Sequence, residues 1–325
     1  MSIYLNDIPQ LSPNQQAFPF VRQLLARPEQ LKVAKKIIGK ATVIDCGINV
    51  PGSWEAGVIF ANVCLGGLAK VSLLWADFSG LHWSAVEVTT DHPVRACLAS
   101  QYAGWAIKKD KFFAMGSGPA RAVAQTEELF TKLGGYKDSS EIVVLCLEGN
   151  KLPTEEAVNL IAEKCGYPAD LYILIAPTAS VVGSVQIAAR SVETGLHKLM
   201  ELGYDLSLIE SGRGIAPVPP IGENDLNALG RTNDAILYGT TVHYTLDDED
   251  ENLLALVNKV PSHSSQDYGA AFQELFERYG NFYDIDPLLF SPAQVWLCNK
   301  RSGNSFGSGK IRPDLLAKSF SLTLD

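Results

Sequence analysis

Segments with helical and strand character alternate along the 325-residue chain, and this alternation limits the possible folds more than any other feature. Apolar residues recur at helical spacing in long segments, and short apolar runs with strand character lie between them. Such a pattern predicts an α/β or α+β fold, with helices layered on sheets. The expected helices are 13–38, 53–65, 93–103, 119–133, 153–165, 181–202, 223–238, 249–258, 267–279 and 312–319; the expected strands are 41–46, 71–76, 84–90, 142–147, 171–175, 206–209, 241–245 and 294–297.

The stretch from Ile142 to Ile175 reads as one strand–helix–strand unit. Pro153 and Thr154 open its helix, and Cys165 with the following glycine closes it. A helical crossover of this kind predicts that the two strands are parallel. Ser53, Thr154 and Ser180 are the expected N-caps of three helices.

The length and the 46% hydrophobic content predict about two domains of roughly 150 residues each. We expect an N-terminal α/β part, about 1–150, with a glycine-rich turn, and a second α/β part, about 151–325, with a polar-striped helix. No Pro/Gly/Ser linker separates two self-contained halves, so the layered domains can interleave. The stretches 211–222 and 247–251 are the candidate breaks.

Charge and composition argue against several kinds of partner. The net charge is −9 and the 27 basic residues are scattered, which makes nucleic acid an unexpected partner. The most apolar stretch, 56–69, is shorter than the roughly 20 residues of a membrane span, so no membrane insertion is expected. The N-terminus lacks a secretory signal and the six cysteines lie mostly in apolar runs, which predicts a cytoplasmic protein.

Motifs of several enzyme classes are missing. The five histidines have no metal-ligand spacing, so we expect no metal site. The chain has no GxSxG nucleophile elbow and no GxGxxG dinucleotide turn after a strand.

Four polar residues interrupt the nearly all-apolar segment 180–198. Gln186, Arg190, Glu193 and His197 follow the spacing i, i+4, i+7, i+11, which places them on one face if the segment is a single helix. A buried carboxylate either takes up a proton or is held ionised by a nearby cation, and Arg190 can supply that charge to Glu193. This balance suits a base that draws a proton from water. The alternative is a purely structural i, i+3 ion pair.

A glycine turn lies between an apolar run and a helix start at 113–121. Free N–H groups of Gly116, Ser117 and Gly118, together with Arg121, could converge there on an anion. The lysine and hydroxyl of a Walker loop are absent, and an ordinary turn is the alternative. The loop 47–53, with Asn49 and Ser53, and the loops 211–220 and 302–309 adjoin strands, where pockets often form, although simple connection is the default.

Several long motifs together suggest a family. The chain resembles the methenyltetrahydromethanopterin cyclohydrolases. The motifs that carry this resemblance, in chain order, are 45–53, 91–93, 100–105, 116–122, 183–190, 192–195, 216–220, 230–239 and 286–293, and they cover nearly the whole chain.

The resemblance implies an enzyme that adds water reversibly to the methenyl carbon between two pterin nitrogens and gives the formyl derivative. It implies no metal, no permanently bound cofactor, a tetrahydromethanopterin derivative as substrate, and a homotrimer. It also implies two α/β-type domains with the pterin pocket between them, and anions held by glycine-rich loops. The family's catalytic glutamate falls on Glu193 and its partner arginine on Arg190. The expected substrate-binding residues are Asn49, Ser53, Gly116, Ser117, Gly118, Arg121, Gln186, His197 and Asn233.

Two other functions stay open from the sequence. One is another enzyme of pterin one-carbon metabolism, such as a dehydrogenase or a formyl transferase. The other is a non-catalytic pterin-binding protein, which needs a pocket but no ionised carboxylate beside an arginine.

Overall fold

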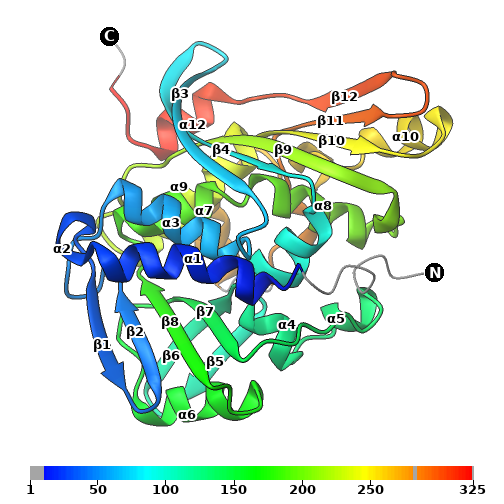
Figure 1. Ribbon diagram of the computed structural model, residues 1–325. Helices are drawn as coiled ribbons and strands as arrows, with labels where there is room; N and C mark the ends of the chain where they lie inside the picture. Colours follow the sequence, from blue (N-terminus) through cyan, green and yellow to red (C-terminus); the bar gives the residue numbers. More distant parts are fainter. Residues whose placement is uncertain (1–10, 281–283, 324–325) are drawn as a thin grey trace. The chain divides into compact units, whose positions relative to one another are not determined.

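The computed structural model describes residues 11–280 and 284–323, and the chain divides into two compact units (Figure 1). Unit 1 consists of Met1–Lys70 and Val94–Gln186, and unit 2 consists of Val71–Pro93 and Ile187–Asp325. The chain therefore passes between units after residues 70, 93 and 186 rather than near residue 150. Two six-stranded sheets with packed helices confirm the α/β class.

The sheet of unit 1 has parallel strands at its centre. Its order is β1 (Ala34–Ile38), β2 (Ala41–Asp45), β8 (Asp170–Ala176), β7 (Ile142–Glu148), β6 (Phe112–Ser117) and β5 (Trp105–Lys109). Strands β2, β8 and β7 are parallel to one another, and β1, β6 and β5 pair antiparallel to their neighbours. The carboxyl ends of three strands, at Asp45, Glu148 and Ala176, thus lie at one edge of the sheet.

Helices cover both faces of this sheet (Figure 1). Alternate residues of β7 show why: Val143 and Leu145 belong to one buried cluster and Val144 to the other. The first cluster includes apolar residues of α6 (Glu155–Lys164), and the second includes those of α1 (Pro13–Ala26) and α3 (Trp54–Cys64). Burial on both faces explains the nearly continuous apolar sequence of β7 and β8.

The predicted strand–helix–strand unit is confirmed. β7 and β8 are parallel, with α6 between them in the chain. The hydroxyl of Thr154 accepts a hydrogen bond from the amide of Ala157 at 3.2 Å, and Ser53 caps α3 in the same way.

Some expected helices of unit 1 are wrong in extent. The expected helix 13–38 is α1, a short α2 (Pro28–Leu31) and strand β1, because Pro28 disfavours helical backbone at Arg27 and begins a new turn. The expected helix 119–133 is divided into α4 (Ala120–Ala124) and α5 (Leu129–Lys132). The expected helix 93–103 is the π-helix η2 (Val94–Gln101). Unit 1 ends within α7 (Val181–Ala188), after Gln186.

Unit 2 contains a mixed sheet. Its order is β12 (Ser305–Gly309), β11 (Gln294–Asn299), β10 (Thr241–Leu246), β9 (Ile209–Pro217), β4 (Leu81–Thr90) and β3 (Lys70–Phe78). β10 and β11 are parallel, while β9 pairs antiparallel to both β10 and β4.

One face of this sheet carries the main core of unit 2. Buried residues of β3 and β4 pack there with α9 (Asp225–Gly239), α11 (Phe272–Tyr279) and α12 (Pro313–Ser319). Other elements of unit 2 are α8 (Ser191–Glu201), η3 (Leu206–Leu208), α10 (Asp250–Val257), η4 (Ser262–Ser264) and η6 (Pro287–Leu289).

Two expected loops of unit 2 contain strands. β9 runs through the glycine- and proline-rich stretch 211–217, and β12 through 305–309. Glycine lowers strand propensity, but in β9 the missing side chains make room for α8, as described below.

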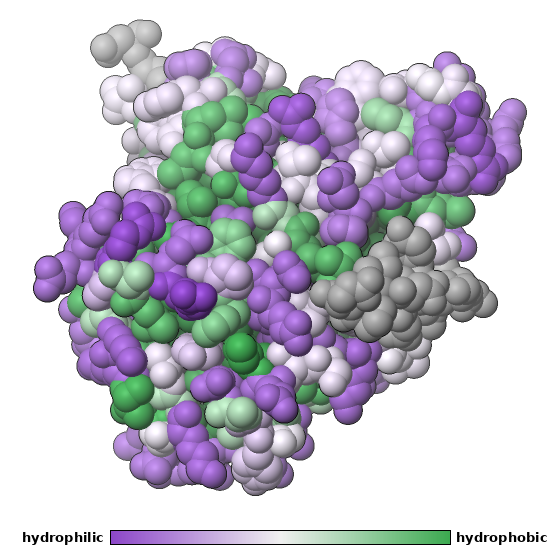
Figure 2. Space-filling view, viewed as in Figure 1, coloured by the Kyte–Doolittle hydropathy of each residue, from purple (hydrophilic) through white to green (hydrophobic). Residues whose placement is uncertain are grey.

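The surface over β11, β12 and α10, at the upper right of Figure 2, is hydrophilic. Ion pairs such as Lys300–Glu210 and Arg301–Asp247 lie in this part of unit 2. Within residues 11–280 and 284–323, no helix is long and apolar enough to cross a membrane.

Candidate active site

The expected single helix 181–202 is two helices, and the break lies at Ala189 and Arg190. α7 ends at Ala188, and Arg190 is the N-cap residue of α8, with φ −85° and ψ 7°. Gln186 and Glu193 therefore do not lie on one continuous helical face. Buried Val185, Ala188 and Val192 continue the apolar spacing across the break, so the sequence pattern gives no sign of it.

Arg190 and Glu193 are brought together at the start of α8. One guanidinium nitrogen, Nη1, lies 3.6 Å from Oε2 of the carboxylate. The side chains are only 11% and 6% exposed, so water screens this pair weakly. Glu193 also lies in the first turn, where the helix dipole favours negative charge. Both features favour an ionised carboxylate that is largely shielded from solvent.

Glycines let α8 pack closely on the sheet of unit 2. A Cβ atom at Gly212 would lie 2.6 Å from Val192, and one at Gly214 would lie 2.5 Å from the hydroxyl of Ser191. On α8 itself, a Cβ at Gly195 would lie 2.2 Å from the hydroxyl of Tyr244. That hydroxyl donates a hydrogen bond to the carbonyl of Val192 at 2.6 Å. The backbone that carries Glu193 is thereby fixed against β9 and β10.

The other predicted site residues of unit 2 have local partners. His197 Nε2 lies 3.8 Å from Oε1 of Glu201, one turn along α8. Asn233 lies on α9, where its side-chain amide donates to the carbonyl of Leu229 at 2.8 Å.

Lys198 lies in a buried environment and is not among the predicted site residues. It is 2% exposed, and its ammonium group donates to the hydroxyl of Ser264 at 3.1 Å and to the carbonyl of Leu288. Burial lowers the pKa of Lys198 to about 8, while the charge of Asp286 acts in the opposite direction. The signal in the sequence was a lysine within an apolar helix.

The predicted anion turn of unit 1 lies between β6 and α4. Gly118 has a φ of 92°, which favours glycine, and its amide donates to the carbonyl of Ser100 at 2.8 Å. The hydroxyl of Ser117 donates to the carbonyl of Gln101 at 2.5 Å. At Gly116, a Cβ would lie 2.8 Å from a backbone carbonyl of β5. These contacts fix the turn against η2 and β5.

Arg121 is fully buried, and its guanidinium forms hydrogen bonds with other groups of the protein. Its guanidinium donates to both carboxylate oxygens of Glu127, at 2.8 and 2.7 Å, and to the carbonyls of Leu98 and Ser100, at 3.1 and 2.8 Å. It also lies over the ring of Tyr102, 5.2 Å from the centroid. With these partners, Arg121 shapes the turn and joins it to the end of η2.

The loop after β2 folds around a buried carboxylate. Asp45 accepts the backbone amides of Gly47, Ile48 and Asn49, and also the side-chain amide of Asn49 at 2.9 Å. Ser53 caps α3 through the amide of Ala56. The polar groups of this loop therefore have internal partners.

Gln186 lies beside the carboxylate of Glu148, which is not among the predicted site residues. Its side-chain amide donates to Oε2 of Glu148 at 3.1 Å, and the hydroxyl of Thr178 donates to Oε1 of Glu148 at 2.5 Å. Glu148 is the last residue of β7, and a polar residue directly after a buried apolar run was the available signal.

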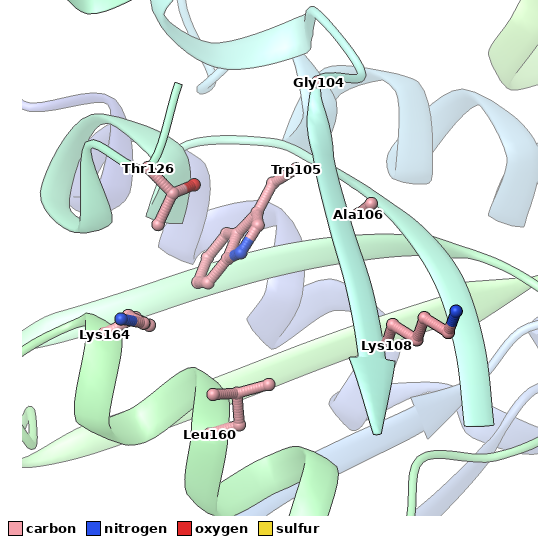
Figure 3. A pocket seen from close by; sticks show the side chains of 7 residues that line it. All are labelled: Gly104, Trp105, Ala106, Lys108, Thr126, Leu160 and Lys164. Atoms are coloured by element: carbon pink, nitrogen blue, oxygen red, sulfur yellow. The ribbon is translucent and has the colours of Figure 1, made fainter. Parts of the chain in front are cut away.

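A separate surface pocket of about 450 Å³ lies between β5 and α6 in unit 1 (Figure 3). Its lining residues are Gly104, Trp105, Ala106, Lys108, Thr126, Leu160 and Lys164. None of the predicted site residues is among them, so the pocket is not part of the candidate active site.

Comparison with known proteins identifies the family. The model of the family described as "Cyclohydrolase (MCH)" matches residues 12–320. A methenyltetrahydromethanopterin cyclohydrolase of Methanococcoides burtonii is 43% identical over 317 residues, covering 96% of this chain and 99% of that protein. Proteins with the same name from Methanocaldococcus jannaschii and Methylobacillus flagellatus are each 42% identical, covering 96% and 95% of this chain and 99% and 95% of their own lengths. The chain belongs to the cyclohydrolase (MCH) family.

Proposed function

We propose that this chain is a cyclohydrolase that adds water to the methenyl bridge of methenyl-tetrahydromethanopterin and gives the formyl derivative. The named activity of its relatives supports this assignment. The structural observation that carries it is the shielded Arg190–Glu193 pair at the start of α8. A protein that only bound a pterin would have no need for a poised carboxylate there.

The proposed reaction uses Glu193 twice. The methenyl carbon belongs to an amidinium cation and is already electrophilic, so the enzyme has to position one water and take a proton from it. As the water oxygen bonds to carbon, Glu193 accepts that proton. The protonated Glu193 then gives it to the departing nitrogen as the carbon–nitrogen bond breaks. The remaining hydroxyl proton leaves to solvent, so one water is consumed and one proton is released.

Arg190 keeps Glu193 ionised and oriented in this scheme, because its guanidinium lies 3.6 Å from the carboxylate. His197, Gln186, Asn233, Asn49, Ser53, Gly116, Ser117 and Gly118 remain proposed substrate contacts. For Arg121 we propose an indirect role, since four hydrogen bonds hold its guanidinium to protein groups.

The test is the decay of methenyl-tetrahydromethanopterin absorbance with purified wild type and Glu193→Gln. Loss of a general base lowers the rate by about 100- to 10,000-fold. We expect a loss of that size in kcat with binding retained. Glu210→Gln is the matched control, since Glu210 lies on β9 and pairs with Lys300 at the surface. No turnover by wild type would favour the binding-protein alternative, and equal turnover by Glu193→Gln would place the base elsewhere.

We further propose a cytoplasmic homotrimer with no permanently bound cofactor. The six cysteines are free thiols, which suits a reducing compartment. Light scattering should give about three times the chain mass of 35.2 kDa. A mass equal to that of one chain would contradict the proposed homotrimer.

A further inference from the structure

The surface pocket of unit 1 between β5 and α6 has a basic lining. Its seven lining residues include two lysines and no aspartate or glutamate of the described chain. The whole chain has 36 acidic and 27 basic residues, so this lining departs from the overall composition. The volume of about 450 Å³ lies within the range of small-ligand sites. The charge of the pocket therefore favours a small anion.

The two lysines belong to different elements. Lys108 lies on β5 and Lys164 in the last turn of α6, and Figure 3 shows them on opposite sides of Trp105. Both are exposed, and neither forms a hydrogen bond or an ion pair with any residue that the structure describes. Glu127, which is next to a lining residue, accepts two hydrogen bonds from Arg121, at 2.8 and 2.7 Å. An anion in the pocket would therefore not compete with a protein carboxylate for the lysines.

The indole of Trp105 supplies a further donor. Trp105 is 6% exposed, and its place in the buried cluster on this face of the sheet holds the ring still. Its Nε1–H has no hydrogen-bond partner in residues 11–280 and 284–323, and the nitrogen is accessible from the surface. In Trp83 the same group donates to the carbonyl of Val218 at 2.9 Å. Because a buried indole usually donates a hydrogen bond, an acceptor atom of a ligand would complete the environment of Trp105.

Between the lysines, the lining is largely apolar. Gly104, Ala106 and Leu160 contribute carbon surface, and Thr126 contributes an exposed hydroxyl. A compact inorganic anion covers little of this surface. An organic dianion with a short apolar spacer can place one charged group at each lysine and cover Leu160 with its middle.

The charges indicate which anionic group suits the ends of such a ligand. Each side of the pocket offers one ammonium group, and a carboxylate carries one negative charge at neutral pH. A phosphate ester carries nearly two charges there, which exceeds the single ammonium group on each side. The lining therefore matches a dicarboxylate better than a bisphosphate.

We propose that this pocket binds a small dicarboxylate, with one carboxylate at Lys108, the other at Lys164, and a carboxylate oxygen accepting the N–H of Trp105. The spacer between the carboxylates lies against Leu160. All these groups belong to unit 1, so the inference does not depend on the proposed cyclohydrolase activity.

The test is isothermal titration calorimetry of the full chain at low ionic strength. The ligands are malonate, succinate, glutarate and adipate, with butyrate and inorganic phosphate as controls. Affinity should rise from malonate to the longer dicarboxylates, because a longer spacer reaches both lysines. Butyrate lacks one charge and phosphate lacks the spacer, so each should bind the wild type about two- to fivefold more weakly than glutarate, the range for an exposed ion pair. Added salt should weaken glutarate binding, since exposed ion pairs are screened.

Variants assign the binding to this pocket. Lys108→Gln and Lys164→Gln should each weaken glutarate binding by about two- to fivefold. Trp105→Phe keeps a ring but removes the N–H, and it should weaken binding by about tenfold, the lower end for a hydrogen bond to a charged group. Lys111→Gln is the matched control, because Lys111 is exposed in the turn after β5 and does not line the pocket. It should keep the wild-type affinity.

Three results would overturn the proposal: no binding of any dicarboxylate, butyrate or phosphate binding as tightly as glutarate, or unchanged affinity in both Lys108→Gln and Lys164→Gln. Circular dichroism checks the folding of each variant, above all of Trp105→Phe, whose ring is part of the core. The two lysines are exposed, so their variants keep the test decisive if Trp105→Phe does not fold. Cyclohydrolase turnover is measured separately, and its absence would contradict the proposed function without affecting the dicarboxylate site.

Discussion

Lys198 is a buried titratable residue on α8, the helix that carries Glu193. Lys198 follows Glu193 by five positions, so the two side chains lie on different faces of α8. Lys198 joins this helix to η4 through Ser264 and to η6 through Leu288. Within the part of the chain that the structure describes, Asp286 is the charged group that acts most on it.

The depressed pKa of Lys198 predicts a pH dependence of stability. Because its folded pKa is about 8, against 10.5 normally, the unfolded state binds more protons than the folded state between these pH values. The free energy of unfolding should therefore rise with pH across this window through Lys198. Lys198→Met lacks this contribution, so its stability relative to wild type should fall by about 1–3 kcal/mol from pH 8 to pH 10.5.

Urea denaturation of wild type and Lys198→Met at several pH values measures this difference. The tyrosines and the other lysines titrate in both proteins, so their contributions cancel in the comparison. If the difference in free energy of unfolding stays constant between pH 8 and pH 10.5, or changes in the opposite direction, the pKa of Lys198 is not lowered in the folded state.

The residue types at the site could be predicted from the sequence, but their partners could not. Arg190 and Glu193 are three residues apart, and the ion pair follows from local geometry alone. Arg121 and Glu148 depend on partners up to 38 positions away, such as Gln186 for Glu148. No local spacing encodes such long-range hydrogen bonds, so the sequence predicts that Arg121 faces an anion and gives no prediction for Glu148.

At the scale of elements, the close packing of α8 on the sheet of unit 2 fixes the position of the proposed catalytic residue Glu193. The helix has glycine at the point where Tyr244 reaches it, and β9 has glycines where the helix reaches the sheet. We therefore expect Gly195→Ala to displace α8, with a loss of about 1–3 kcal/mol in stability and a clear loss of kcat.

A double-mutant cycle tests whether the Tyr244 hydroxyl is the obstacle. Tyr244→Phe removes the atom that would lie 2.2 Å from the new Cβ, at the expense of the hydrogen bond to Val192. The pair Gly195→Ala and Tyr244→Phe should therefore be less damaging than the sum of the single changes. Denaturation and kcat measurements on wild type, the two single variants and the double variant give the coupling energy between the two positions. Additive effects would mean that contact with the Tyr244 hydroxyl is not the reason for glycine at position 195.

Elements with a strong apolar period were predictable, and those fixed by tertiary packing were not. β7, α6 and β8 follow from their pattern because both sheet faces are covered. The edge strand β1 is largely exposed and carries Lys35 and Lys36, so it lacked the alternation that signals a strand. β9 contains glycines because α8 packs closely against it, and a glycine-rich sequence is typical of a loop. In both cases the neighbours of the segment, rather than its own sequence, determine its structure.

For the whole molecule, the interleaved division of the chain predicts how fragments behave. Residues 187–325 lack β3 and β4, so β9 loses its partner from Ala85 to Thr90. The core of unit 2 also loses Phe78, Leu81 and Ala85. We expect this fragment to remain unfolded, whereas residues 71–93 joined to it by a flexible linker of about 20 residues should fold.

Circular dichroism and the cooperativity of urea unfolding distinguish the two fragments. Cooperative unfolding of residues 187–325 alone would contradict the expectation, because it would show that the first two strands are dispensable. A linked fragment that stays unfolded would show that unit 2 depends on unit 1.

Because the chain alternates between the two units, strands that pair in unit 2 are synthesised far apart in time on the ribosome. The hairpin of β3 and β4 emerges early, but its partner β9 begins only at Ile209, more than a hundred residues after Thr90. At roughly 5–20 residues per second, the nascent hairpin waits on the order of ten seconds with an unpaired edge. Meanwhile the segments of unit 1 that follow are made and can fold. A cell that makes this protein must therefore keep an open β-edge from pairing with other chains during translation, a task suited to chaperones that act at the ribosome.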